Sequence, residues 1–115
     1  MAGLTAATKE AAAVAIDGLG TWVSLHTADP GTSGTSEATG GAPAYARKQT
    51  TWTAGAADGV VNGSQVTIDA AAGTYTYAGL WSAATAGTFV GSVAITSTTL
   101  GAQGQVLVTP TITVS

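Results

Sequence analysis

The sequence predicts a mainly β protein, a small antiparallel β-sandwich or barrel with one N-terminal α-helix. Two observations carry this prediction. After Gly20, apolar residues recur at every second position in several short segments, which glycine-bearing turns separate. Before Gly20 lies one alanine-rich stretch, and it is the only good helix candidate of the sequence.

The helix is expected over residues 4–19, in the sequence LTAATKEAAAVAIDGL. Thr5 is a suitable N-cap, and Gly18 and Gly20 are expected to end the helix because glycine adopts the left-handed conformation at low cost. The apolar stripe of this helix is mostly alanine and buries little area, so we expect the helix to dock on something larger. The stripe comprises Leu4, Ala7, Ala11, Val14 and Ala15.

Six strands are expected, and their apolar and polar residues alternate. In the first, TWVSLHT, Val23 and Leu25 point to one side, and Trp22, Ser24 and His26 point to the other. Four more are expected at residues 44–52, 64–71, 74–81 and 88–95, and the last lies in the C-terminal segment.

The C-terminal segment QVLVTPTITVS keeps one face apolar through Pro110, with Val106, Val108, Ile112 and Val114 on that face. Because proline has no N–H to donate, this strand is expected to be an edge strand or to bulge there. An edge strand accepts a strand from a neighbouring chain, so the C-terminus is a candidate contact surface.

Residues 28–43 are expected to form an exposed loop. The turn Asp29-Pro30-Gly31 opens it, and GTSGTSEATGG follows without a large apolar residue. Loops of this length in a small domain are usually functional or mobile, so this one is a candidate contact loop.

Composition limits the classes of partner. Alanine, glycine, threonine and serine supply 69 of the 115 residues, and charged residues supply only 8%. A net charge of −3 argues against nucleic acid, and the absence of cysteine excludes disulfides and thiol chemistry. No apolar run approaches the roughly 18 residues of a membrane-spanning helix. We expect one domain over residues 1–115, with residues 1–20 as its helical N-terminal segment, and no membrane partner.

Candidate catalytic residues are few. His26 has Asp29 three residues away but no serine in a nucleophile elbow, so the expected role of His26 is that of a sheet-surface or turn-bonded residue. Asp58, Asp69 and Glu37 each have an ordinary surface explanation. One histidine and six scattered carboxylates do not give a metal-binding spacing. The sequence predicts no enzyme, no cofactor and no metal.

The aromatic residues allow two interpretations of their role. Tyr75, Tyr77 and Trp81 are candidates for a sugar-stacking platform, which defines a carbohydrate-binding module as one alternative. A chain this poor in large aliphatic residues also needs its tryptophans to fill the core, and core or interface packing is the stronger reading. Arg47 and Lys48 are expected as rim charges that pair with acidic groups of a neighbour.

Three segments together resemble a family of small virion proteins of tailed bacteriophages. They are SLHTADPGTSG from Ser24, GGAPAYARK from Gly40 and AGLWSAATAGTFVGS from Ala78, and Ala86 stands where a second glycine is common. The resemblance implies a non-enzymatic structural part of the particle, since members are described as head decoration, minor capsid or tail-fibre-like proteins. It supplies no catalytic residues.

The first functional hypothesis is a homo-oligomeric capsid decoration or minor capsid protein, made in the host cytoplasm, that binds the major capsid protein on the shell exterior. A tail tip or tail-fibre component is the alternative within the virion. Many weak contacts give a high overall affinity when they are linked in one assembly. The candidate contact residues are Leu4, Ala7, Ala11, Pro30, Glu37, Arg47, Lys48, Ile112 and Val114.

Overall fold

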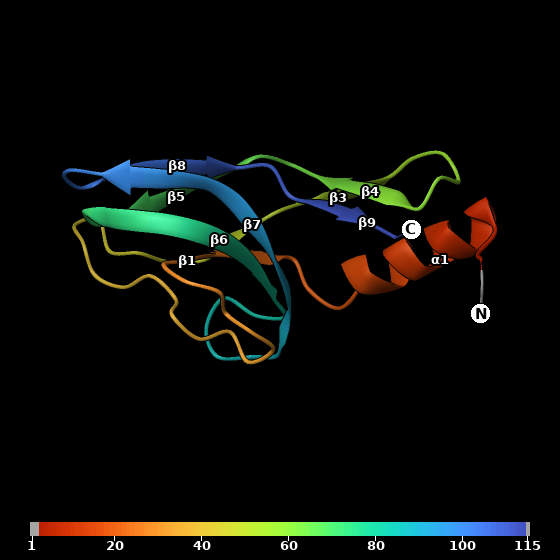
Figure 1. The fold of residues 1–115 in the computed structure, drawn as a ribbon, viewed down its shortest axis with the longest axis horizontal. Helices are drawn as coiled ribbons and strands as arrows, with labels where there is room; N and C mark the ends of the chain where they lie inside the picture. The colour runs from red at the N-terminus through yellow and green to blue at the C-terminus, as the bar shows by residue number, and fades with distance from the viewer. Residues whose placement is uncertain (1–2, 115) are drawn as a thin grey trace.

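A single helix and a set of antiparallel strands make up the computed structural model, which describes residues 3–114 (Figure 1). The chain is mainly β, with 44% strand and 11% helix, so the predicted class is confirmed. The elements are α1 Ala6–Asp17, β1 Trp22–His26, β2 Lys48–Gln49, β3 Trp52–Ala54, β4 Val60–Gly63, β5 Val66–Ala70, β6 Gly73–Trp81, β7 Phe89–Leu100, β8 Gly104–Val108 and β9 Thr111–Thr113.

The strands form three antiparallel sheets. The largest has the order β2-β1-β6-β7, a second has the order β3-β4-β9, and the third pairs β5 with β8. The four-stranded sheet and the β5–β8 pair lie at one end of the molecule, and the β3-β4-β9 sheet continues toward α1 at the other (Figure 1). The molecule is therefore elongated, with extents of 46 × 25 × 24 Å.

The core lies between the four-stranded sheet and the β5–β8 pair. Val23 and Leu25 of β1 supply one side, and Ile68 of β5 supplies the other. The alternating faces predicted for β5 are present, because the residues of even number are buried. The remaining buried members are Ala38, Val66, Ala70, Tyr75, Ala78, Val106 and Val108.

The helix begins where the sequence predicts and ends differently. Thr5 is the N-cap, and its hydroxyl accepts from the Thr8 N–H at 3.1 Å. The helix ends at Asp17, but Gly18 has φ −72° and stays right-handed, so the predicted left-handed cap there is wrong. The N–H of Gly18 still reaches the Val14 carbonyl at 3.2 Å, which continues the helical turn.

Two of the predicted strands are each divided between two shorter strands. The segment 44–52 contains β2 and the start of β3, and the C-terminal segment breaks at Pro110 into β8 and β9. The apolar face of that segment is nevertheless maintained across the proline, because residues of even number from Val106 to Val114 are buried or half-buried. β9 is an edge strand, as predicted, since it is last in the order β3-β4-β9.

Residues 28–43 contain no strand among the named elements, but the expectation that they are exposed throughout is wrong. Pro30, Gly34 and Ala38 are buried. The loop folds back along β1: the Ala38 N–H donates to the Leu25 carbonyl at 2.9 Å, and the Thr27 N–H donates to the Ser36 carbonyl at 3.0 Å. These bonds lie along the edge of β1. The loop also covers the face of β1 that carries His26, because the Thr35 carbonyl lies 2.8 Å from His26 Nδ1.

Candidate functional site

Arg47 is the centre of a buried polar cluster. Its Nε donates to Glu37 Oε2 at 2.8 Å and its Nη2 donates to Oε1 at 2.9 Å, which makes a bidentate ion pair. The guanidinium carbon lies 3.7 Å from the centroid of the Trp81 indole ring. Tyr45 completes the cluster, since its hydroxyl donates to Glu37 Oε2 at 2.7 Å. We call Glu37, Tyr45, Arg47 and Trp81 the Arg47 cluster.

The Arg47 cluster holds two loops together. Nη1 of Arg47 donates to the carbonyls of Ala83 at 3.1 Å and Ala86 at 2.8 Å, both in the connection between β6 and β7. Glu37, on the other side of Arg47, belongs to the 28–43 loop. The expectation that Arg47 is a rim charge is therefore wrong: its charge is paired within the chain.

The ionisation of the cluster follows from its contacts. Burial pushes the pKa of Glu37 upward, but the hydrogen bonds from Arg47 and Tyr45 outweigh burial and hold the pKa below its usual range. Burial, and then the hydrogen bond to Glu37, raises the pKa of Tyr45. The charges are thus fixed as one carboxylate and one guanidinium at neutral pH.

The three segments that resemble phage virion proteins meet at this cluster. Arg47 comes from the second segment and Trp81 from the third. Gly34, from the first, has φ +76°, and a Cβ placed on it would overlap the Trp81 ring. Their shared location indicates that these motifs specify a folded junction of loops.

A second buried network joins Ser24 and His26. His26 Nδ1 lies 2.8 Å from the Thr35 carbonyl, and because a carbonyl only accepts, Nδ1 carries the proton of a neutral ring. Nε2 then accepts from the Ser24 hydroxyl at 2.7 Å, and Ser24 Oγ accepts from Trp81 Nε1 at 3.0 Å. Of the two positions expected for His26, the sheet surface is wrong, since His26 is fully buried, and its bond to the Thr35 carbonyl agrees with the turn-bonded one.

This network resembles a nucleophile and its base but has no access for a substrate. Ser24 and His26 are both 0% exposed, and Phe89 packs edge-on against His26 with ring centroids 6.1 Å apart. Burial lowers the pKa of His26, which favours the neutral ring. The network therefore satisfies buried polar groups beneath the loop.

The remaining candidate residues, none of which the sequence favours as catalytic, lie in turns or in the core. Asp58 Oδ1 accepts from the Val60 N–H at 3.0 Å within a turn. Within residues 3–114, no three His, Cys, Asp or Glu side chains lie close enough to hold a metal ion. In the same range no helix has the length and apolarity to cross a membrane. Tyr75 and Trp81 are buried, so they do not form an exposed sugar-stacking platform.

The predicted contact residues fall into two groups. Ala7 and Ala11 are exposed on α1, and Ala13 is the residue that the helix buries. Leu4 precedes the helix and is half-buried. Lys48, Ile112 and Val114 are half-buried. Pro30, Glu37 and Arg47 are instead engaged in the loop and its cluster, where Pro30 is fully buried.

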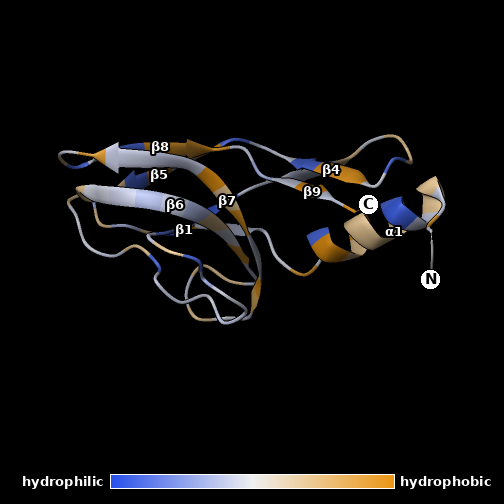
Figure 2. Cartoon of the chain, in the orientation of Figure 1, coloured by the Kyte–Doolittle hydropathy of each residue, from blue (hydrophilic) through white to orange (hydrophobic). Residues whose placement is uncertain are grey.

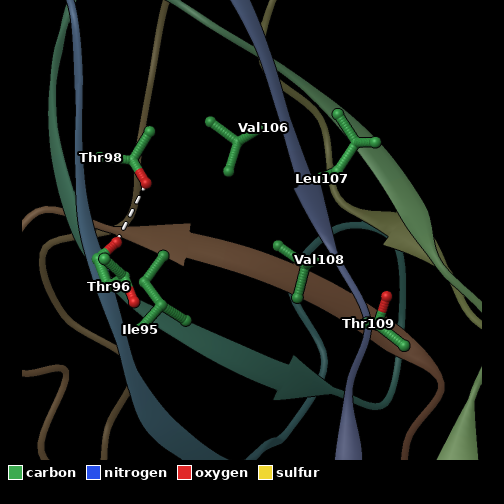
Figure 3. Close-up of a pocket in the computed structure, with 7 residues that line it drawn as sticks. All are labelled: Ile95, Thr96, Thr98, Val106, Leu107, Val108 and Thr109. Atoms are coloured by element: carbon green, nitrogen blue, oxygen red, sulfur yellow. Dashed lines mark hydrogen bonds between the residues drawn. The ribbon is translucent and has the colours of Figure 1, made fainter.

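A groove along β7 is the larger of two hollows that border this strand, and sequence reasoning missed it. It measures about 690 Å³ and runs between residues 90–95 and residues 108–113, with Ile16, Trp52 and Leu80 at its walls. A smaller cavity of about 260 Å³ adjoins it between β7 and β8 and shares Ile95, Val108 and Thr109 (Figure 3). We call the two hollows together the β7 seam.

The β7 seam is apolar. Hydrophobic colouring covers the first half of β7 and parts of β8 and β9 (Figure 2). Val93 is 60% exposed, although it lies in the middle of a long strand. The signal in the sequence is the uncharged run of residues 89–100, whereas the expected strand covers residues 88–95 and ends before residue 96.

The fold and its buried clusters define a β-rich structural module in which the polar groups hold loops in place. The chain belongs to the family described as Podophage GP4 fiber I protein gp80, which its sequence matches over residues 5–115. It is a structural protein of a phage particle, in agreement with the resemblance at that level. Comparison with curated proteins and with solved structures gave no significant match.

Proposed function

We propose that the chain is a component of a fibre on a phage particle, and that it acts there as a structural subunit. The observation that carries this proposal is the family match, which extends over residues 5–115 and whose description is that of a fibre protein. This makes the tail-fibre alternative the preferred hypothesis and the capsid-decorating role the weaker one.

The shape of the chain supports a fibre role. The longest extent is 46 Å against 25 and 24 Å, and the radius of gyration is 14.7 Å. A compact domain of this length has a radius of gyration of about 13 Å. An elongated module suits end-to-end or side-by-side assembly better than a flat cover on a shell.

The exposed surface also supports a structural role. Ala7 and Ala11 on α1 leave an uncharged stripe outside the chain's own core, and β9 leaves a strand edge. Helix and edge lie at one end of the molecule, whereas the connection between β6 and β7, which Arg47 binds, lies near the middle of its length (Figure 1). We propose that these two surfaces contact neighbouring chains of the particle, and that the buried cluster holds the loops around Arg47 in place.

The test is quantitative mass spectrometry on heads and tails separated from purified particles. A fibre component of the tail is recovered with the tails at low copy number. Recovery of hundreds of copies with the heads would overturn the proposal and restore capsid decoration. The major capsid protein, measured in the same fractions, controls for incomplete separation.

A further inference from the structure

The longest strand of the chain has one edge without a strand partner. β7 pairs with β6 on one side, and within residues 3–114 no strand pairs with its other side. Proteins commonly protect such edges with short strands, charges or proline, because free N–H and C=O groups recruit other chains. β7 has twelve residues without charge or proline, and Gly91–Ala94 is a regular run between its two irregularities.

The residues that line the β7 seam place this edge inside it. Successive side chains of a strand point to opposite faces, so a hollow on one face is lined by alternate residues. The groove is lined by consecutive residues, 90–95 on β7 and 108–113 on the facing segment, and also by Val23, Ala78, Gly79 and Leu80 of the strands behind β7. Because β7 is the last strand of its sheet, the groove extends from the inner face of the sheet to the open edge of β7. β8 and β9 each pair on one side only within the described chain, so the facing segment also has an open edge.

The chemistry of the seam selects its occupant. All residues that line the two hollows are uncharged. An anionic polymer binds to basic side chains. The three basic residues of this chain lie outside the lining, and they are Lys9, Arg47 and Lys48. A second copy of this chain presents the same neutral, apolar strand edge, so the contact brings no like charges together. The backbone of the second copy supplies hydrogen-bond partners for the free N–H and C=O groups of β7.

The open edge of β7 is long enough for a β-ladder between two copies. Its twelve residues at about 3.3 Å each give a length of about 40 Å, and an average strand has only about five or six residues. We propose that the β7 seam is the interface between two copies of this chain.

The experiment measures the mass of the full chain by native mass spectrometry and light scattering over a concentration series, for the wild type and two variants. Val93→Lys puts a charge in the seam, and Leu19→Lys is the matched control outside it. Val93 and Leu19 are 60% and 59% exposed, so neither substitution is expected to destabilise the fold. Circular dichroism verifies that each variant is folded.

The expected result is an oligomeric wild type whose dissociation constant rises about tenfold or more in Val93→Lys and changes less than about twofold in Leu19→Lys. Amide exchange of residues 90–95 is then slower in the oligomer than in the dilute chain. A wild type that stays monomeric at every concentration overturns the proposal. Equal effects of the two variants, or unchanged exchange over 90–95, overturn it as well. The proposal does not depend on whether the protein belongs to a fibre or to the head.

Discussion

The guanidinium carbon of Arg47 lies over the Trp81 indole ring, 3.7 Å from its centroid, and the same guanidinium holds Glu37 in a bidentate pair. Arginine suits this position because one planar group stacks on the ring and presents a fork of donors to the carboxylate. One side chain thus joins the 28–43 loop, the β6–β7 connection and the sheet beneath them.

Replacement of Arg47 is expected to destabilise the fold strongly. In Arg47→Met the Glu37 carboxylate loses its partner in a partly buried site, and removal of one partner from a buried pair costs about 3–5 kcal/mol. Urea unfolding measures the change in free energy. Lys48→Met, at the next residue along the chain and the first of β2, is expected to stay within about 0.5 kcal/mol of the wild type. Equal losses in both variants would contradict the central role of Arg47.

Gly34 is expected to be essential for packing as well as for backbone conformation. Gly34→Ala places a Cβ against the Trp81 ring, whereas Gly31→Ala has open space at a similar positive φ, +62° against +76°. Both variants lose the conformational freedom of glycine, but overpacking adds about 1–3 kcal/mol at Gly34 alone. Thermal and urea unfolding of the two variants separate the cost of overpacking from the cost of the backbone conformation. A larger loss of stability in Gly31→Ala than in Gly34→Ala would contradict the packing role of Gly34.

Ala86 is expected to be a strained residue that glycine improves. Its φ is +53°, and the left-handed conformation costs a non-glycine residue about 1–2 kcal/mol. Ala86→Gly removes that cost, but glycine loses more conformational entropy on folding, which lowers the stability by about 0.5–1 kcal/mol. The free energy of unfolding is therefore expected to rise by about 0.5 kcal/mol. Ala84→Gly, where φ is not positive, should only lose stability. Destabilisation of the same size in both variants would argue against strain at Ala86.

Acid is expected to destabilise the protein in two steps. The pKa of buried His26 is below its ordinary value of 6.5, so the unfolded chain binds a proton more readily and stability falls as the pH drops below about 6.5. The pKa of Glu37 is also lowered, so its contribution is present above pH 4.5 and is lost as the pH falls through its folded-state pKa.

Urea unfolding between pH 7.5 and pH 3.5 measures both steps of this acid dependence. His26→Gln should flatten the upper step and Glu37→Gln the lower one, because each variant removes the titrating group. Stability that rises as the pH falls from 7 to 5 would contradict the buried, neutral state of His26.

Sequence periodicity predicted the side to which residues point better than it predicted their burial. Alternation correctly put Ser24 and His26 on the face opposite Val23 and Leu25. It could not indicate that this face is covered, because the cover is the glycine-rich 28–43 loop. Trp81 and Phe89, which fill the space, arrive from strands far along the chain.

The Arg47 cluster was partly readable in the sequence. Tyr45 and Arg47 are two residues apart in an extended segment and therefore point to the same side, where both engage Glu37. What the sequence lacks is the position of Glu37, since a loop without periodicity gives no register. The full length of β7 was missed for a related reason, because the threonine-rich residues 96–99 show no apolar alternation.

The central claim is that the chain forms part of a fibre, and imaging tests it most directly. Purified particles are labelled with gold-tagged antibody fragments against the exposed surface of the folded chain and viewed by electron microscopy. The account predicts label on thin appendages that project from the particle. Label spread evenly over the head shell would contradict it.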